Sequence, residues 1–252
     1  MIKVQALREY LGEGKASVGG WMQIKSSEIA EILGSSGLDW VAVDLEHGSI
    51  GMDHLTNICR AIELHNTLPF VRLPKADPIL ARRALDLGAA GIIVPNIQMW
   101  HEIEEVKKVM YYPPEGKRGV GYCRGNLYGA EFERHLDDKP FLVAMIESQL
   151  GVNNITTILD TKPDAVLIGP YDLSASFNIT GQFDSHAFKE IVKHVRQSCI
   201  ERKIPVGIHV VQPDLKELEE RKEEGYTFLP YTIDSVVLSK HYNITDNHKS
   251  FI

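Results

Sequence analysis

The chain has 252 residues, with 27 Lys+Arg against 34 Asp+Glu, so its formal net charge is −7 at pH 7. This length fits one large α/β domain or two small ones. Net acidity argues against a nucleic-acid partner, because phosphate binding needs a basic face. The scattered Cys59, Cys123 and Cys199 provide neither a disulfide framework nor a cysteine-rich zinc site. The sequence offers no signal peptide and no apolar run of the roughly 20 residues that a membrane helix needs. We therefore expect a cytoplasmic protein without a membrane or nucleic-acid partner.

Short apolar runs recur along the chain, and most of them lack polar alternation. The eight runs are Gly20–Gln23, Trp40–Asp44, Pro69–Leu73, Gly91–Pro95, Pro140–Glu147, Ala165–Gly169, Val206–Val211 and Thr227–Ile233. Strands that are buried on both faces, as in a parallel sheet between helices, have this pattern. We therefore expect eight strands.

Amphipathic segments of helical length separate these runs. They cover Ser27–Gly34, Met52–His65, Asp77–Gly88, Met99–Met110, Gly151–Leu159, Phe188–Arg202 and Pro213–Gly225. Asp77 is expected to cap its helix, with Pro78 in the first turn. The alternation predicts a single (β/α)8 barrel domain over residues 1–252. An open doubly wound sheet is the alternative, although no Gly-rich dinucleotide fingerprint follows the first strands. The irregular segment Tyr111–Asp138 interrupts the rhythm, and long loops in compact domains are usually functional or mobile.

Carboxylates follow two neighbouring strands of the expected barrel, in which the active site lies at the carboxyl ends of the strands. Glu147 and Asp172 occupy these positions. Two carboxylates at adjacent strand ends can share a divalent cation and leave positions for water and substrate. The alternative is that each is an ordinary loop carboxylate or a helix cap.

Asp44 and His47 stand three residues apart at the end of the second run. A carboxylate beside an imidazole fixes its tautomer and raises its basicity, which suits a general base; the alternative is a structural histidine. Arg72 ends the third run, and its planar fork suits a substrate carboxylate or an enolate oxygen. An internal ion pair with Glu46 or Asp86 explains Arg72 equally well.

The sixth run continues into a tight turn, Gly169-Pro170-Tyr171-Asp172, that opens a short helix. Free backbone N–H groups in such a turn can hold a carboxylate, although a simple strand-to-helix turn has the same sequence pattern. Trp21 either lines the floor of the site or belongs to the core. We expect His209 to lie in the barrel core or behind the site.

Taken together, these segments resemble the HpcH/HpaI family of metal-dependent class II aldolases, which act on pyruvate-derived enolates. The segments that carry the resemblance are Leu38–Gly48 (LDWVAVDLEHG), Phe70–Pro78 (FVRLPKADP), Leu85–Pro95 (LDLGAAGIIVP), Tyr112–Gly121 (YPPEGKRGVG), Met145–Glu147 (MIE) and Ile168–Ser176 (IGPYDLSAS). They occur in the family's order from about Gly20 to Asp234. Each motif alone is weak, whereas the combination is specific.

The resemblance implies a (β/α)8 TIM barrel of the phosphoenolpyruvate/pyruvate superfamily, often with its last helix exchanged between subunits. The family's metal ligands match Glu147 and Asp172, which would hold Mg²⁺, Mn²⁺ or Co²⁺. Its base-assisting pair matches Asp44 and His47, and its enolate-contacting arginine matches Arg72.

The resemblance also implies a homo-oligomer, a hexamer or a trimer. The family's interface aspartate, which lies near a neighbouring subunit's site, matches Asp86. The backbone around Gly169 and Asp172 would hold the pyruvate carboxylate, next to Pro170 and Tyr171.

Some positions depart from the family pattern. Met145 stands where the studied aldolases often have Gln, which removes a polar contact near the pyruvyl oxygen. The last run contains Leu229-Pro230-Tyr231-Thr232, where a Val-Gly pair is usual. In the irregular segment, Arg124 either binds an anionic or hydroxylated acceptor or is solvated. These differences suggest a substrate unlike the usual dicarboxylic one.

The function expected from this resemblance is reversible cleavage of a 4-hydroxy-2-keto acid to pyruvate and an aldehyde through a metal-bound enolate. A lysine Schiff base is disfavoured because the strand ends offer no lysine, and the nearest, Lys75, lies beyond Pro74. One alternative is a related citrate-lyase-β or malyl-CoA-lyase type of carbon–carbon lyase. Another is a non-catalytic paralogue that binds a keto acid, but such a sensor needs no base. The sequence does not name the aldehyde.

Overall fold

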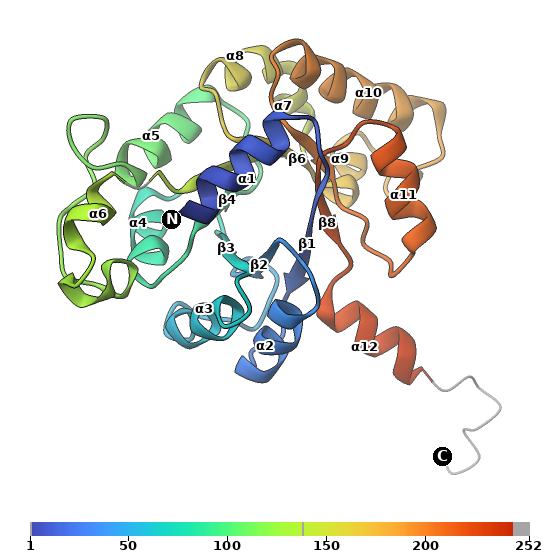
Figure 1. The fold of residues 1–252 in the computed structure, drawn as a ribbon. Helices are drawn as coiled ribbons and strands as arrows, with labels where there is room; N and C mark the ends of the chain where they lie inside the picture. Colours follow the sequence, from blue (N-terminus) through green and yellow to red (C-terminus); the bar gives the residue numbers. More distant parts are fainter. Residues whose placement is uncertain (1, 138, 244–252) are drawn as a thin grey trace.

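The computed structural model describes residues 2–137 and 139–243 and contains eight parallel strands that alternate with helices (Figure 1). The strand order is β7-β6-β5-β4-β3-β2-β1-β8. A bridge between Val210 and Tyr231 brings β7 to β8 and closes the ring. The expected (β/α)8 barrel is therefore confirmed, and the open doubly wound sheet is excluded. The last residues of the 1–252 range lie outside the described part of the chain.

All eight apolar runs contain strands. These are β1 (Ser17–Met22), β2 (Trp40–Asp44), β3 (Leu68–Arg72), β4 (Gly91–Val94), β5 (Phe141–Ile146), β6 (Ala165–Ile168), β7 (Val206–Ile208) and β8 (Phe228–Tyr231). β1 begins three residues before its predicted start, because Ser17 pairs with Phe228 at the foot of β8. An apolar pattern does not reveal such a contact with a distant strand.

Most of the helices that follow the strands lie where amphipathic segments predict them, whereas the helices over Phe132–Leu136 and Asp234–Tyr242 were not predicted. The helices are α1 (Ile2–Gly12), α2 (Ser27–Ser35), α3 (Leu55–Glu63), α4 (Pro78–Asp86), α5 (Trp100–Met110), α6 (Phe132–Leu136), α7 (Gln149–Asn153), α8 (Ile155–Asp160), α9 (Pro170–Ser176), α10 (His186–Glu201), α11 (Leu215–Glu223) and α12 (Asp234–Tyr242), with a short 3-10 segment η1 (Arg124–Gly129). The cap at Asp77 is confirmed, since its Oδ1 accepts from the backbone N–H of Ile79 at 2.8 Å and of Leu80 at 3.1 Å. The single helix expected over Gly151–Leu159 is wrong, because the backbone leaves helical geometry at Asn154 and separates α7 from α8.

An aromatic layer fills the barrel near the amino-terminal ends of its strands. Trp40, Phe70, Phe141 and Phe228 stack there, and the Trp40 and Phe228 ring centroids lie 4.3 Å apart. Helix α1, which crosses this end of the barrel in Figure 1, packs its buried apolar residues on the layer. Gly19 makes room for the Trp40 ring of this layer, because a Cβ at Gly19 would overlap that ring.

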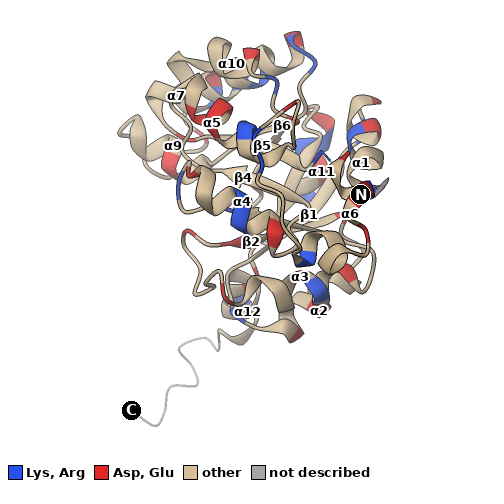
Figure 2. Cartoon of the chain, turned by 90° about the vertical axis from the view of Figure 1, so that its left-hand side faces the viewer, with Lys and Arg blue, Asp and Glu red and all other residues tan. Residues whose placement is uncertain are grey.

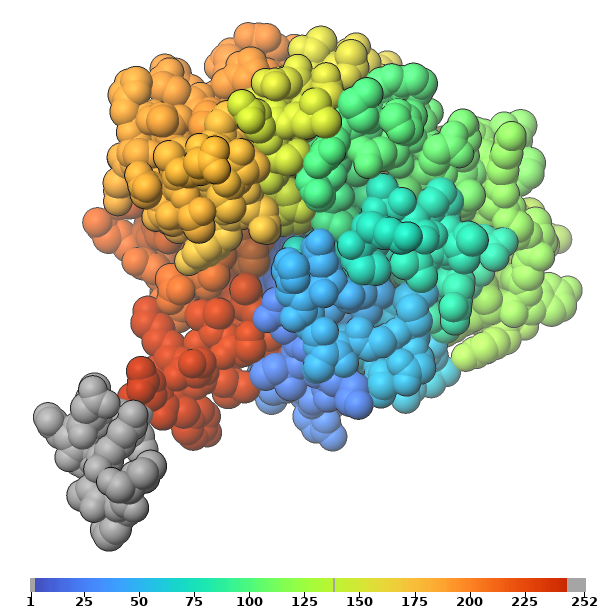
Figure 3. Space-filling model, turned by 180° about the vertical axis from the view of Figure 1, so that it is seen from behind, coloured from blue at the N-terminus to red at the C-terminus, as the bar shows by residue number. Residues whose placement is uncertain are grey.

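A second apolar layer lies between the strands and the surrounding helices. Acidic and basic residues are mixed over the helices and loops around it (Figure 2). The view from behind looks onto the carboxyl ends of the strands, where segments that follow several strands meet around a central hollow (Figure 3). No helix among the described residues is long and apolar enough to cross a membrane. The barrel is thus filled at one end and presents its strand-following loops at the other.

Replacing Gly19 by Ala is expected to lower the free energy of unfolding by about 1–3 kcal/mol, because the new methyl group must displace the Trp40 ring. Urea denaturation followed by circular dichroism measures the change. Gly12→Ala is the matched control, since nothing lies within 4 Å of a Cβ at that position. The control should stay within about 0.5 kcal/mol of the wild type. Wild-type stability in Gly19→Ala would contradict tight packing of the aromatic layer.

Candidate active site

The candidate site is built on a buried ion pair between neighbouring strands. In the β2–β3 register Asp44 lies directly beside Arg72, and both residues end their strands. Arg72 Nε donates to Asp44 Oδ1 at 2.9 Å, and Arg72 Nη2 donates to Oδ2 at 2.5 Å. The Asp44 side chain is fully buried, and that of Arg72 is 5% exposed. Two parallel hydrogen bonds of this kind fix both the distance and the orientation of the guanidinium.

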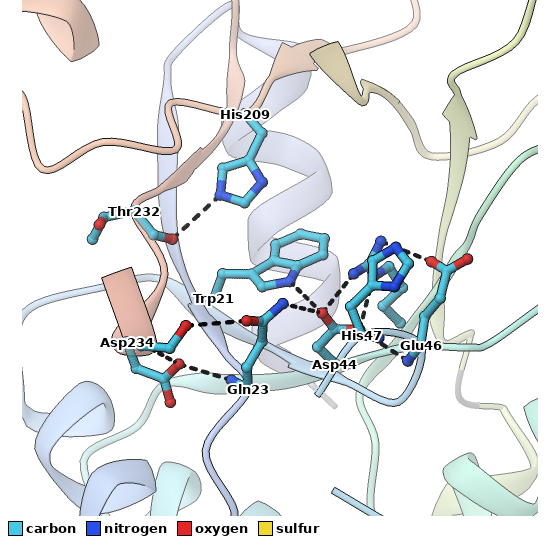
Figure 4. A network of polar contacts seen from close by, with 10 residues as sticks. Trp21, Gln23, Asp44, Glu46, His47, His209, Thr232 and Asp234 are labelled. Atoms are coloured by element: carbon cyan, nitrogen blue, oxygen red, sulfur yellow. Dashed lines mark hydrogen bonds and ion pairs between the residues drawn. The ribbon is translucent and has the colours of Figure 1, made fainter. Parts of the chain in front are cut away.

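Other donors surround the same carboxylate (Figure 4). Oδ2 also accepts from Trp21 Nε1 at 3.1 Å and from Gln23 Nε2 at 3.0 Å. Oδ1 also accepts from the backbone N–H of Glu46 at 2.9 Å and of His47 at 3.2 Å. Burial alone would raise the pKa of Asp44, but the hydrogen bonds and charge of Arg72, with the bonds from Gln23 and Trp21, bring it to about 2. The carboxylate is therefore ionised and held by three donors at each oxygen.

The contact between Asp44 and His47 differs from the expectation. The carboxylate accepts from the backbone N–H of His47, and the imidazole belongs to an exposed residue at the rim of the site. Asp44 therefore shapes the turn that carries His47, and the direct carboxylate–imidazole pair is not formed in the structure. An exposed imidazole at the rim can still accept a proton from a bound molecule.

Arg72 contacts a second carboxylate and an aromatic ring. Its Nη1 lies 2.7 Å from Glu46 Oε2, and its guanidinium carbon lies 5.0 Å from the centroid of the Trp21 ring. The sequence alternative of an ion pair with Glu46 is thus correct, and the one with Asp86 is not. Each η nitrogen carries two hydrogens, so one on each is not used by Asp44 or Glu46. Trp21 is therefore buried in the core, in contact with both Asp44 and Arg72.

Glu147 directly follows β5 and is short of hydrogen-bond partners. Its Oε1 accepts from the backbone N–H of Asn96 at 2.7 Å, whereas its Oε2 is buried without a hydrogen-bond partner among the described residues. Burial raises the pKa of Glu147 to about 7, with further raising by the charges of Asp172 and Glu46, while the Asn96 bond and Arg72 oppose the shift. A buried carboxylate oxygen that faces other negative charges is a natural place for a cation.

The turn after β6 brings Asp172 to Glu147. Asp172 is exposed in the first turn of α9, behind the buried Pro170. A Cβ on Gly169 would overlap Glu147 Oε2 and would lie 2.7 Å from the Cε of Met145. Glycine at this position therefore leaves room beside the unpaired oxygen, and Met145 makes that part of the floor apolar. Tyr171 is 47% exposed, and its ring stands edge-on to that of Phe183 at 4.9 Å.

The donor set fits a hard divalent cation. Glu147 and Asp172 supply carboxylate oxygens, the ligands that Mg²⁺ and Mn²⁺ prefer. In the described part of the chain, no group of three His, Cys, Asp or Glu residues converges closely enough to hold a metal ion. Two carboxylates would leave the remaining positions for substrate and water.

His209 lies behind the site, as expected. It is 9% exposed, its ring lies 4.8 Å from that of Trp21, and its Nε2 donates to the Thr232 carbonyl at 3.3 Å. Burial lowers its pKa to about 4, and the charge of Arg72 lowers it further, whereas the Thr232 bond and Asp44 act in the opposite direction. A neutral His209 therefore supports the Trp21 ring.

Two expected site residues lie elsewhere in this chain. Arg124 forms an ion pair with Glu63 and packs against Gly88, at the amino-terminal end of the strands. Its predicted contact with substrate is therefore not formed within one chain. Asp86, at the end of α4, binds Arg118 Nη2 at 2.7 Å. Its role beside a neighbouring subunit's site stays a prediction.

Sequence reasoning missed Gln23 and the backbone of Asn96 as parts of the site. Gln23 follows Trp21 by two residues, so the alternation of a strand places both side chains on the inner face. The two-residue spacing of Trp21 and Gln23 could therefore have predicted that Gln23 points to the same face as Trp21. The Asn96 contact depends on a left-handed backbone, with φ of 46°, and no sequence pattern announces its direction. Lys75 is exposed, and its Nζ lies 3.8 Å from Asp77 Oδ2.

Comparisons with known proteins agree with this geometry. A model of the HpcH/HpaI aldolase/citrate lyase family matches residues 17–240. The chain is 34% identical over 184 residues to the hydroxypyruvate/pyruvate aldolase of Roseobacter denitrificans, covering 71% of this chain and 72% of that protein. It is 30% identical to the 2-dehydro-3,6-dideoxy-6-sulfogluconate aldolase of Pseudomonas putida, covering 90% of each. The crystal structure of a family member from Burkholderia cenocepacia superposes with a TM-score of 0.87 at 26% identity, covering 94% of this chain and 95% of that one.

The buried His209 predicts an acid-dependent loss of stability. Below about pH 6.5 the unfolded chain protonates this histidine, whereas the folded chain does not until about pH 4, so stability falls as pH falls through this window. His209→Gln keeps an N–H for Thr232 and has no such proton. The variant should lose about 3 kcal/mol less than the wild type between about pH 7 and about pH 4. Urea unfolding at both pH values measures the difference.

His194 provides the control, because it is exposed on α10. His194→Gln should follow the wild-type dependence of stability on pH. Equal acid sensitivity of His209→Gln and the wild type would contradict a neutral, buried His209.

Proposed function

The chain belongs to the HpcH/HpaI aldolase/citrate lyase family, and from that premise we propose that it uses a divalent cation to cleave a 4-hydroxy-2-keto acid to pyruvate and an aldehyde. It is an aldolase, as its relatives are. The observation that best supports metal dependence is the buried Oε2 of Glu147, without a hydrogen-bond partner among the described residues and close to the charge of Asp172. Mg²⁺, Mn²⁺ and Co²⁺ are the candidate ions.

The roles of the site residues follow from their contacts. Glu147 and Asp172 would hold the cation, and the backbone from Gly169 to Asp172 would lie against the keto acid's carboxylate. When bound, the cation supplies Lewis-acid polarisation of the keto acid's oxygens. Met145 gives this region of the floor an apolar surface in place of an amide.

Arg72 is fixed before substrate arrives. Two carboxylates and the Trp21 ring hold its guanidinium, so its free η hydrogens keep one direction. A donor that needs no rearrangement stabilises the negative oxygen that develops during cleavage more than a mobile donor does. Arg72 would therefore bind the oxygen of the enolate that is later protonated to pyruvate.

The proton path starts at the rim. His47 would take the proton of the substrate's 4-hydroxyl, the C3–C4 bond would break, and its electron pair would form the enolate. The C4 carbon leaves as the aldehyde, and a proton delivered to C3 completes pyruvate. His47 is suited to this exchange because its residue is exposed while the hydrogen bond to Asp44 holds its backbone.

We also propose that the chain acts as a homo-oligomer, a trimer or a hexamer. The segment between α5 and α6 exposes large apolar side chains, with Val120 62%, Tyr122 78%, Leu127 54% and Tyr128 62% exposed. Exposed apolar clusters of this kind mark interaction surfaces. A second subunit that covers this segment would also bring a partner close to Asp86, which lies beneath it and contacts Cys123 and Arg118.

Removing either of the two carboxylates should abolish the metal-dependent reaction. Glu147→Gln and Asp172→Asn are expected to lower metal-stimulated exchange of pyruvate methyl protons in D₂O at least about 100-fold, since even residues that only support metal ligands cost 10–100-fold. Proton NMR with Mg²⁺, Mn²⁺ or Co²⁺ measures the exchange without knowledge of the aldehyde. Asp184→Asn is the matched control, because Asp184 is a fully exposed carboxylate. It should keep the wild-type rate.

Full exchange in either site variant would contradict the metal assignment. Wild-type protein that exchanges no protons with any of the three metals would contradict pyruvate as the donor. Binding of CoA esters would then become the next measurement, because a thioester lyase shares the barrel and the carboxylates.

Placing a charge in the exposed apolar segment should dissociate the oligomer. Tyr122→Asp is expected to lower the molar mass measured by size-exclusion chromatography with light scattering, because the acid would be desolvated in the interface. Within the described chain the Tyr122 ring stands edge-on to that of Phe132, with the ring centroids 5.7 Å apart. A monomeric wild type would contradict the proposal.

A further inference from the structure

A chain of hydrogen bonds connects the start of α12 to the buried Asp44 (Figure 4). Ser235 Oγ donates to Gln23 Oε1 at 3.1 Å, and Gln23 Nε2 donates to Asp44 Oδ2 at 3.0 Å. Ser235 lies 212 residues from Gln23 in the sequence. A single side chain, that of Gln23, therefore connects the first turn of α12 to the Asp44 carboxylate, which orients Arg72.

The orientation of the Gln23 amide is determined by its neighbours. A carboxylate oxygen only accepts, so the amide nitrogen must face Asp44. The amide oxygen then faces Ser235, whose hydroxyl can donate. Each end of the amide has a partner of the required kind, so the side chain has one stable orientation rather than two.

Asp234 fixes the backbone on both sides of this chain. Its carboxylate is buried and accepts from the backbone N–H of Gln23 at 2.9 Å and of Ile24 at 3.0 Å. Its Oδ1 also accepts from the N–H of Ser235 at 2.7 Å. One carboxylate thereby joins the residues after β1 to the first turn of α12, and the spacing between Gln23 and Ser235 is set.

We propose that Gln23 is a positioning residue, through which the seating of α12 on Asp234 controls the orientation of the Asp44–Arg72 pair. The inference rests on the proposed function only for its effect on turnover. Of the donors to Asp44 Oδ2, Trp21 and Arg72 come from strands of the barrel, whereas Gln23 is held at its far end by α12. A shift of α12 therefore changes one of the three bonds at Oδ2 directly.

Loss of this bond has a defined consequence for Arg72. Arg72 is shared between Asp44 and Glu46. A carboxylate with one donor fewer has more freedom to rotate, and the guanidinium follows because it is bound to both oxygens. The free η hydrogens then lose their fixed direction, which lowers the rate of enolate formation more than it lowers the affinity for the keto acid.

The first experiment reads the hydrogen-bond network without using activity. Trp21 Nε1–H donates to the same Oδ2, so its indole resonance in ¹H–¹⁵N NMR spectra reports on Asp44. The chain has three tryptophans, and Trp21→Phe assigns the signal. Gln23→Met, which keeps the length of the side chain and removes its polar ends, should shift this resonance. Ser235→Ala should shift it in the same direction by a smaller amount.

The double variant distinguishes a relay from two separate effects. If Ser235 acts through Gln23, Ser235→Ala will cause no further shift in the Gln23→Met background. Ser49→Ala is the matched control, because Ser49 Oγ donates to the backbone carbonyl of Gln23 at 3.3 Å and does not touch its amide. It should leave the Trp21 resonance in place.

The second experiment measures turnover in the same variants. Gln23→Met is expected to lower kcat for pyruvate proton exchange about 10-fold, the lower end for residues that support a site from behind, with KM changed less than about twofold. Ser235→Ala should lower kcat less, and Ser49→Ala should match the wild type.

The outcomes separate the two proposals. Additive shifts of the Trp21 resonance in the double variant, or no shift in Ser235→Ala, would overturn the relay whatever the activity. A wild type without exchange would overturn the proposed function while the NMR comparison still decides the role of Gln23. If Gln23→Met does not fold, Ser235→Ala alone decides, because it removes a half-buried hydroxyl at the start of α12.

Discussion

An ionised carboxylate that is buried away from water must be surrounded by hydrogen-bond donors of the protein, and this requirement organises the centre of the barrel. Asp44 is fully buried and ionised, so each of its oxygens needs donors that the protein itself provides. They come from β1, from β3 and from the turn after β2. The indole of Trp21, the guanidinium of Arg72 and the backbone of His47 are therefore placed by one group. The site is organised before any ligand arrives.

The distribution of charge across the site is uneven. On one side Arg72 neutralises Asp44 and Glu46 in part, and the oxygens there are well bonded. On the other side Glu147 is buried, and its burial, together with the charges of Asp172 and Glu46, raises its pKa to about 7. The same barrel end thus offers a fixed positive group for an anionic oxygen and an unbalanced pair of carboxylates for a cation. A chelating 2-keto acid matches both halves.

The architecture could be predicted from the sequence because parallel strands buried on both faces leave a strong apolar signal, which marked all eight strands. The short helix α6 was hidden in the segment that the sequence marked as irregular. The helices α1 and α12 were missed because neither has a strong amphipathic pattern: one lies on the aromatic layer and the other contacts the barrel mainly at its first turn. At the site, the positions of Asp44, Arg72, Glu147 and Asp172 follow from strand ends, and Asp44 and Arg72 meet through the strand register. Two features could not be predicted from the strand ends: the contact of His47 with Asp44 through its backbone, and the position of Arg124 away from the site, paired with Glu63. Both depend on the direction of a loop, which turn geometry determines. Gln23 depends on α12 and was hidden for that reason.

The filled end of the barrel has a consequence for how substrates and products enter and leave the site. The stacked aromatic rings and α1 occupy the interior at the amino-terminal ends of the strands. Ligands would therefore enter and leave at the carboxyl ends, past the exposed His47. Because Arg72 is buried and His47 is exposed, a molecule held by Arg72 would lie deeper than one bound at the rim. In a site with one entrance, the deeper product departs second, so in the proposed reaction the aldehyde would leave before pyruvate and, in the reverse direction, pyruvate would bind first.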